Sequence, residues 1–249
     1  MNFQKTAAII LAAGKGTRIN AKDKNKVMFE LAKKPMLAYS VEKLRQIGIG
    51  QIILVVGFAK DSVVDYFKES VDYAVQKKRL GTGHAAKIGL IKLKKEINYV
   101  LVFYGDDSAF YPKRLFRKLI NTCQKEKAVL AFLTLTKKDP FGLGRIIRNK
   151  KGEVLKIIEE KNATPAEKKI KEINMGCYCF RRDFLEKFIA RIKKDRIKGE
   201  YYLTDIVKIA LDANQPIKTI KIKNEDFWHG VNTRKEFLKA QRKIEKLNG

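Results

Sequence analysis

A short loop rich in small residues follows the first apolar run of the chain. The run Thr6–Leu11 leads directly into Ala12-Ala13-Gly14, and the cations Lys15 and Arg18 come next. Alanine and glycine let the main chain approach a ligand closely, and successive backbone N–H groups in such a loop can hold phosphate oxygens. Arginine can grip a phosphate with two parallel hydrogen bonds. The loop is therefore predicted to hold a nucleoside triphosphate by its phosphates.

The spacing of this loop differs from that of the two best-known phosphate-binding loops. A P-loop needs Gly, four residues and then Gly-Lys followed by Ser or Thr, and the sequence contains no such run. The dinucleotide-binding pattern Gly-x-Gly-x-x-Gly fails because Ile19 stands where the third glycine belongs. The alternative for the glycines alone is an ordinary strand-to-helix turn.

Two more segments place polar side chains next to glycines or at the end of an apolar run. Gln76 precedes Gly81-Thr82-Gly83, and its amide can both donate to and accept from the edge of a pyrimidine. Asp106 and Asp107 follow the apolar run that ends at Tyr104, and a carboxylate beside bound phosphates is a natural Mg²⁺ ligand. The alternatives are a polar turn before a helix capped by Thr82, and an aspartate turn that caps a helix.

Apolar runs alternate with amphipathic segments through the first half of the chain. This alternation predicts an α/β fold with a doubly wound, mostly parallel, Rossmann-like sheet covered by helices on both faces. Ligands bind beyond the carboxyl ends of the strands in such sheets, so the Gly14 loop and the Asp106 segment should face one crevice. The expected strands are Thr6–Leu11, Gln51–Val56, Tyr73–Val75, Tyr99–Tyr104 and Val129–Thr134, and the expected helices lie near Met36–Gln46, Asp61–Phe67, Thr82–Leu93 and Lys113–Lys125.

The pattern changes after about residue 137 and indicates a smaller, β-rich substrate lobe on the same core. No linker is recognisable, so residues 1–249 are expected to form a single domain. Its parts would be a nucleotide-binding core (1–136), the lobe with completion of the core (137–230) and a C-terminal helix (231–249). The expected strands are Arg145–Arg148, Val154–Glu160, Ile173–Phe180 and Ile217–Ile222, and the expected helices are Phe184–Ile192, Asp205–Asp212 and Thr233–Leu247, the last with Thr233 and Glu236 as a capping box.

The composition argues against several classes of protein. The 249 residues are 45% hydrophobic, which suits one large α/β domain. No apolar run is long enough to cross a bilayer and the first residues lack a signal-peptide pattern, so a cytoplasmic protein without a membrane partner is expected. Three cysteines argue against a disulfide framework, and with only two histidines they are too few for a metal–thiolate site.

The formal net charge is +27, from 54 Lys and Arg against 27 Asp and Glu. Such an excess can mark a nucleic-acid-binding protein. Here the cations are spread along the whole chain, with acidic residues among them, and there is no basic arm, zinc-finger spacing or ribonucleoprotein motif. A solvated, lysine-rich surface is therefore favoured, and a nucleic-acid partner is not expected.

In this order, the segments resemble the sugar-phosphate nucleotidyltransferases, and most closely the uridylyltransferase domain of bacterial N-acetylglucosamine-1-phosphate uridylyltransferase. The resemblance covers nearly the whole chain. It is carried by residues 11–18, Lys26-Val27, Gln76, residues 80–85, Tyr104-Gly105-Asp106, Gly142-Leu143-Gly144-Arg145-Ile146, Glu159, Lys161, residues 172–176, residues 199–206 and residues 230–234.

The resemblance implies transfer of a uridylyl group from UTP to N-acetylglucosamine 1-phosphate, with Mg²⁺ as cofactor. The products would be pyrophosphate and UDP-N-acetylglucosamine, a cell-envelope precursor. The implied nucleotide-binding residues are Leu11, Ala12, Ala13, Gly14, Gln76, Gly81 and Thr82. The implied phosphate-holding catalytic residues are Arg18 and Lys26, and the implied Mg²⁺ ligands are Asp106 and Asn232. The implied sugar-binding residues, which make the lobe a sugar-binding lobe, are Tyr104, Gly144, Glu159, Asn174 and Thr204.

The chain departs from the pattern of these relatives in three ways. Asp107-Ser108 stands where a small apolar residue and proline are expected, and the second carboxylate either binds metal or only alters the turn. Asn162 replaces an aspartate that is frequent in the family. No hexapeptide β-helix pattern is found, so no acetyltransferase domain is expected, and the protein should be a monomer or a weak oligomer.

Two other functions stay open at this point. One is nucleotidyl transfer with another sugar 1-phosphate or another nucleotide. The other is a basic nucleic-acid-binding protein on a degenerate transferase fold. The presence of Arg18, Lys26, Asp106 and Asn232 argues against the second.

Overall fold

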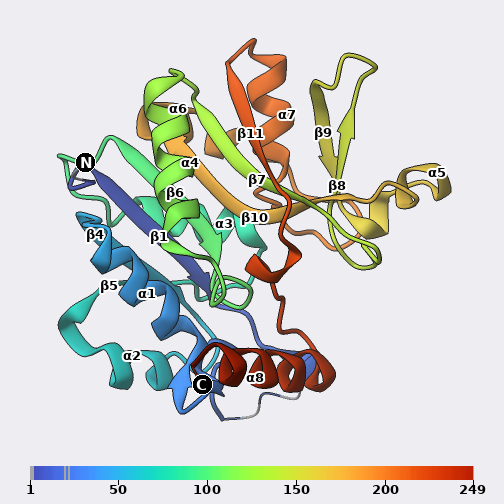
Figure 1. The fold of residues 1–249 in the computed structure, drawn as a ribbon. Helices are drawn as coiled ribbons and strands as arrows, with labels where there is room; N and C mark the ends of the chain where they lie inside the picture. Colours follow the sequence, from blue (N-terminus) through green and yellow to red (C-terminus); the bar gives the residue numbers. More distant parts are fainter. Residues whose placement is uncertain (1–2, 20, 22, 249) are drawn as a thin grey trace.

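The computed structural model describes residues 3–19, 21 and 23–248, and its centre is one large sheet (Figure 1). Seven strands form a row in the order β11-β7-β10-β6-β1-β4-β5, and β8 and β9 extend the sheet from β10. The row consists of β1 (Thr6–Ala12), β4 (Gln51–Val56), β5 (Asp72–Val75), β6 (Tyr99–Tyr104), β7 (Leu130–Thr136), β10 (Glu172–Arg181) and β11 (Ile217–Ile222).

All but one of the strands in this row point the same way. β1 pairs in parallel with β4 and β6, β4 with β5, and β7 with β11. β10 lies antiparallel between β6 and β7, so it is the exception. The expectation of a mostly parallel sheet is therefore confirmed.

Helices cover both faces of the sheet, which makes it doubly wound. Successive side chains of a strand point to opposite faces. In β1, Ala8 and Ile10 accordingly pack with the helices of one face, and Ala7 and Ile9 with those of the other. The first face carries α1 (Met36–Gln46), α2 (Asp61–Phe67) and α4 (Lys113–Lys125), and the second carries α3 (Thr82–Leu90), α6 (Arg182–Phe188) and α7 (Asp205–Asp212).

A hairpin projects from the sheet beside the short helix α5 (Pro165–Lys168), at the right of Figure 1. Its strands are β8 (Arg145–Arg148) and β9 (Val154–Ile158), and β8 joins β10 where Arg145 pairs with Ile173. β9 ends before Glu159, two residues earlier than expected. The division into parts at residues 136 and 230 stays a prediction.

Two helices end sooner than their apolar periodicity suggests. α3 ends at Leu90 rather than Leu93, because Lys92 and Leu93 donate to the carbonyls three residues back and tighten the last turn. The helix expected over Phe184–Ile192 is α6, which begins at Arg182 and is followed by a 3₁₀ turn over Ile189–Arg191. Side-chain burial continues through such turns, so periodicity alone does not reveal them.

The last helix, α8 (Arg234–Asn248), returns the chain to its first half (Figure 1). Its Ala240 and Ile244 belong to one buried cluster with Leu31 and Met36. Leu31 lies in the small hairpin of β2 (Glu30–Leu31) and β3 (Lys34–Pro35), and Met36 directly follows it. Just before the helix, the backbone N–H of Val231 donates to the carbonyl of Asp106. The segment before α8 is thereby held against the loop that follows β6.

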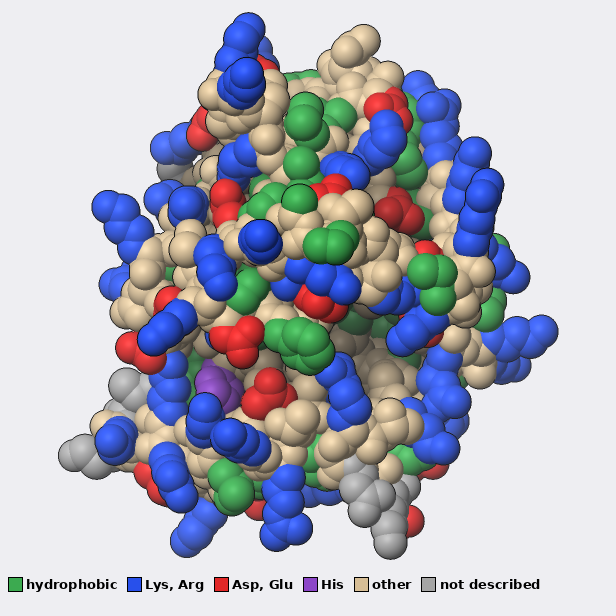
Figure 2. All heavy atoms as spheres, turned by 90° about the vertical axis from the view of Figure 1, so that its right-hand side faces the viewer, with side chains coloured by type: hydrophobic (Ala, Val, Ile, Leu, Met, Phe, Trp, Pro, Cys, Tyr) green, Lys and Arg blue, Asp and Glu red, His purple; other side chains and the backbone are tan. Residues whose placement is uncertain are grey.

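On the face of the molecule that Figure 2 shows, the positive charge is dispersed. Figure 2 shows lysine and arginine side chains over the whole of one face, with aspartate and glutamate among them. This distribution supports the interpretation as a solvated surface. Among the described residues, no helix is both long and apolar enough to span a bilayer. The cysteines Cys123, Cys177 and Cys179 are unpaired and buried.

Candidate active site

A cavity of about 660 Å³ opens at the carboxyl ends of β1, β5 and β6. The Gly14 loop and the Asp106 segment both line it, as expected from the position of ligands in such sheets. The predicted site residues in its wall are Leu11, Ala12, Ala13, Gly14, Arg18, Lys26, Gln76, Gly81, Thr82, Tyr104, Asp106, Gly144, Glu159, Asn174 and Asn232. Thr204 alone among the predicted residues is not part of the wall.

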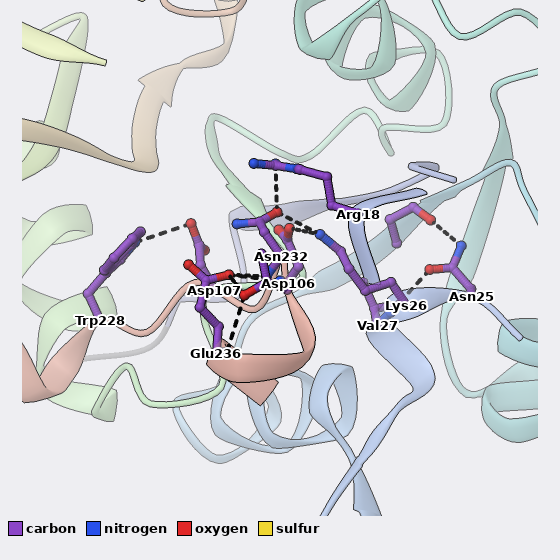
Figure 3. Close-up of polar contacts among 11 residues, drawn as sticks. Arg18, Asn25, Lys26, Val27, Asp106, Asp107, Trp228, Asn232 and Glu236 are labelled. Atoms are coloured by element: carbon purple, nitrogen blue, oxygen red, sulfur yellow. Dashed lines mark hydrogen bonds and ion pairs between the residues drawn. The ribbon is translucent and has the colours of Figure 1, made fainter. Parts of the chain in front are cut away.

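Four polar side chains from distant parts of the sequence converge on one side of the cavity (Figure 3). The Lys26 ammonium donates to Asp106 Oδ2, and it also donates to Asn232 Oδ1 at 3.0 Å. The Arg18 guanidinium donates to the same Asn232 oxygen at 3.0 Å, across 214 residues of sequence. Two cations and two oxygen acceptors are thus gathered at one point.

The oxygens at this point suit a divalent cation. Mg²⁺ binds through one or two carboxylate or amide oxygens and completes its shell with water and phosphate oxygens. Asp106 Oδ2 and Asn232 Oδ1 already share one cation, the Lys26 ammonium, so they face the same small volume. No three His, Cys, Asp or Glu side chains gather as a metal site within residues 3–19, 21 and 23–248. The donor set therefore fits a metal that substrate phosphates help to hold.

Asn25 holds Lys26 in place, a role that was not predicted from the sequence. Its side-chain amide donates to the carbonyls of Ala12 and Phe58 at 2.8 and 2.7 Å, and its Oδ1 accepts from the N–H of Val27. Asn25 is 1% exposed, so these bonds are buried. They join the end of β1 to the segment that carries Lys26. Asparagine before Lys-Val is a typical capping residue, and this signal could have identified it.

Asp107 points away from Asp106 and towards Trp228 (Figure 3). Its Oδ2 accepts from the Trp228 indole N–H at 3.2 Å, and its buried Oδ1 has no hydrogen-bond partner among the described residues. Burial, with the charge of Asp106 as a second cause, raises the pKa of Asp107 well above its usual value. Of the two roles left open for Asp107, the structure favours shaping of the turn through Trp228.

The shape of the cavity wall near Gln76 depends on a glycine. Gly81 has a φ of +95°, and a Cβ there would lie 2.5 Å from the carbonyl oxygen of Tyr201. Gly81, not Thr82, is the residue before the first turn of α3, and the Thr82 hydroxyl instead accepts from the N–H of Leu203. The first turn of α3 is thus packed against the segment around residue 201.

Another part of the cavity wall carries the predicted sugar-binding residues. The Thr204 hydroxyl lies behind Glu159 and donates to its Oε1 at 3.0 Å, which orients the carboxylate. Burial raises the pKa of Glu159. The Asn174 amide donates to the Tyr178 hydroxyl at 2.6 Å and accepts from the N–H of Gly176 at 3.1 Å. A Cβ at Gly144 would stand 3.7 Å from the Glu159 carboxylate, so a larger residue there would fill the space beside Glu159.

An ion pair that was not predicted from the sequence shapes the loop 142–144. Arg145 is 1% exposed, and its Nη2 lies 2.5 Å from Glu160 Oε2. Its Nη1 donates to the carbonyl of Leu143. Glu160 in turn accepts from the N–H of Gly142 at 3.2 Å. The pair ties the loop 142–144 to the residue next to Glu159. The sequence around Arg145 gave no signal for this ion pair, because the partner Glu160 lies in the segment that follows a different strand, β9.

Comparisons with known proteins identify the family of the chain. The sequence model of the nucleotidyl transferase family matches residues 7–247. The chain is 42% identical to the bifunctional protein GlmU of Geobacter metallireducens over 238 residues, which is 95% of this chain and 50% of that protein. It is 36% identical to the protein of the same name from Carboxydothermus hydrogenoformans, over 95% of this chain and 52% of that protein.

The chain thus spans about half the length of these curated relatives. A solved structure described as UDP-glucose pyrophosphorylase complexed with UDP-glucose has a TM-score of 0.81. It is 20% identical and covers 97% of this chain and 99% of the other, so it shows a shared fold. The resemblance read from the sequence is confirmed by these matches: the chain belongs to the nucleotidyl transferase family.

Proposed function

We propose that this protein transfers a uridylyl group from UTP to N-acetylglucosamine 1-phosphate and releases pyrophosphate, with Mg²⁺ as cofactor. One observation carries the proposal more than any other. Arg18, Lys26, Asp106 and Asn232 come from separate segments and meet at one point of a single cavity. Cations beside a carboxylate and an amide oxygen suit the phosphates of a nucleotide and a divalent metal.

The reaction needs alignment and charge neutralisation more than proton transfer. A phosphate oxygen of the sugar phosphate would form a bond to the α-phosphorus of UTP, while the bond to the bridging oxygen breaks and pyrophosphate leaves. The attacking oxygen is already anionic, so no general base is required. Lys26 and Arg18 would offset the repulsion between the two anions and hold them in line.

Mg²⁺, when bound, would neutralise charge on the phosphates. The residues to hold it are Asp106 and Asn232, whose oxygens share the Lys26 ammonium. Lys26 is therefore expected to exchange this contact for phosphate oxygens when nucleotide and metal bind.

The lining of the cavity supports the choice of substrates. Gln76 and Gly81 line it together with Ala12 and Ala13, and these residues would hold a pyrimidine base and ribose. Glu159 and Asn174 also line it, and their polar atoms can hold the hydroxyl and acetamido groups of a sugar. A site built for such groups rejects an analogue that leaves its polar atoms unpaired.

A pyrophosphate-release assay tests the proposal directly. Four nucleoside triphosphates are combined with N-acetylglucosamine 1-phosphate, glucose 1-phosphate and other sugar phosphates, with Mg²⁺ and with a chelator. The expected result is turnover that requires the metal and is fastest with UTP and the N-acetylated sugar. Equal use of glucose 1-phosphate would contradict the assigned sugar, and release of no pyrophosphate from any pair would contradict the reaction itself.

A further inference from the structure

The imidazole of His84 has no part in the proposed reaction, yet it contacts a side chain of the cavity wall. His84 lies in the first turn of α3, and its Nδ1 is 3.0 Å from the amide nitrogen of Gln76. The same amide nitrogen lies 3.1 Å from the carbonyl oxygen of Gly81. Gln76 is 5% exposed and lines the cavity, whereas His84 stands behind it. The three groups form one small network.

The chemistry of the network determines which way the Gln76 amide faces. A backbone carbonyl can only accept a hydrogen bond, so the amide atom that faces Gly81 must be the NH₂ nitrogen. Its two protons are then used, one on Gly81 and one on His84. His84 must therefore accept at Nδ1, which requires a neutral ring with its proton on Nε2. Burial, with the charge of Lys87, lowers the pKa of His84 and favours this neutral form.

The network leaves the Gln76 carbonyl oxygen for a ligand. No described residue donates a hydrogen bond to Oε1, and both hydrogen bonds of this side chain involve its amide nitrogen. An acceptor in this place suits a base with a ring N–H. Uracil has N3–H and the acceptor O4, whereas cytosine has a lone pair at N3 and an amino group in place of O4. An amide turned by half a revolution would present NH₂ and suit cytosine N3 instead.

We propose that His84 is a positioning residue for base selection: its Nδ1 lone pair keeps the Gln76 amide oxygen towards the base and so favours uracil over cytosine. The inference rests on the proposed binding of a nucleoside triphosphate in this cavity. The carbonyl of Gly81 also accepts from the Gln76 amide nitrogen, so one of the two contacts that orient this amide does not depend on His84. Removal of the His84 ring therefore weakens the preference without abolishing nucleotide binding.

The test compares UTP with CTP in two variants and a control. His84→Ala removes the acceptor. His84→Asn keeps one, because asparagine Oδ1 takes the place of histidine Nδ1 on the same γ-carbon. Lys87→Ala changes an exposed residue one turn further along the helix. Two quantities are measured at pH 8. One is kcat/KM for each nucleotide at saturating sugar phosphate, and the other is the affinity for each nucleotide, determined by calorimetry.

The expected fall in the UTP-to-CTP ratio for His84→Ala is about three- to tenfold, the worth of one hydrogen bond, in both measurements. His84→Asn should keep most of the preference and Lys87→Ala all of it, while the KM for the sugar phosphate stays constant. An unchanged ratio in His84→Ala, or an equal decrease for both nucleotides, overturns the inference, as does wild-type protein that binds CTP as tightly as UTP. Selective UTP binding by wild type without pyrophosphate release contradicts the proposed function alone.

Discussion

Glu236 holds the backbone of Asn232: its Oε2 accepts from the N–H groups of Asn232 and Thr233, each at 2.8 Å (Figure 3). The Thr233 hydroxyl accepts from the N–H of Glu236 in return, at 3.2 Å, so the capping box expected from the sequence is present. The cap of α8 therefore does two things. It begins the last helix, and it places an oxygen of Asn232 beside Asp106 and Lys26.

Glu236→Ala should weaken both roles. Removal of the cap should lower the free energy of unfolding by about 1–2 kcal/mol, and a freer Asn232 should raise the Mg²⁺ concentration needed for half-maximal pyrophosphate release. Urea unfolding and a metal titration measure the two effects. Glu245→Ala, an exposed glutamate of the same helix, is the control. A less stable variant with an unchanged metal requirement would limit Glu236 to the cap.

Asp106→Asn should keep the fold and lose most of the activity. The substitution removes the formal charge from the proposed metal site, and turnover should fall by roughly two or more orders of magnitude, equal to about 3 kcal/mol of transition-state stabilisation. Asp107→Asn is the control, because Asp107 contacts Trp228. Its effect on turnover should be smaller. Wild-type turnover of Asp106→Asn at ordinary Mg²⁺ would remove Asp106 from the site.

Asn174→Ala should narrow the preference for N-acetylglucosamine 1-phosphate over glucose 1-phosphate more than it weakens UTP binding. Each hydrogen bond to the acetamido group that can no longer form costs about 1–3 kcal/mol, or roughly ten- to a hundredfold in specificity. Tyr178→Phe, which removes the hydroxyl that orients the amide, should have an intermediate effect. The measurement is kcat/KM for both sugars. An unchanged ratio in Asn174→Ala would place the selecting group elsewhere.

Lys43 should make stability depend on pH in the alkaline range. Burial lowers the pKa of Lys43 from 10.5 to about 8, and its ammonium donates to the carbonyl of Ala109 at 2.5 Å. Between these two values the unfolded chain binds more protons than the folded protein, so the free energy of unfolding should rise with pH. Relative to Lys43→Met, wild type should gain roughly 2 kcal/mol between pH 7.5 and pH 9.5.

Urea unfolding at pH 7.5, 8.5 and 9.5 checks this sign for wild type and variant. Lys118→Met, at an exposed lysine of α4, is the matched control for the removal of one charge. A wild-type stability that falls relative to Lys43→Met as the pH rises would mean that the ammonium is stabilised, not penalised, in the folded protein.

Local sequence was enough for most of the elements that carry the site. The spacing of apolar residues predicted α1, α2, α4 and α7 with the bounds that the structure has, because each helix buries one continuous stripe. The same pattern placed the Gly14 loop and Asp106 at strand ends, and a parallel sheet brings those ends to one edge. The resemblance to a known family supplied the remaining site residues, since no period or spacing singles out Glu159 or Asn174.

Only the tertiary structure decided how these side chains are partnered. The contacts of Lys26 with Asn232, of Thr204 with Glu159 and of Asp107 with Trp228 join segments far apart in the chain. Hydrogen bonds depend on distances of a few tenths of an ångström, which periodicity does not contain. Sequence therefore determined which residues reach the cavity edge, while the packing of segments far apart in the chain, α8 among them, determined which of them face the cavity and which hold a neighbour in place.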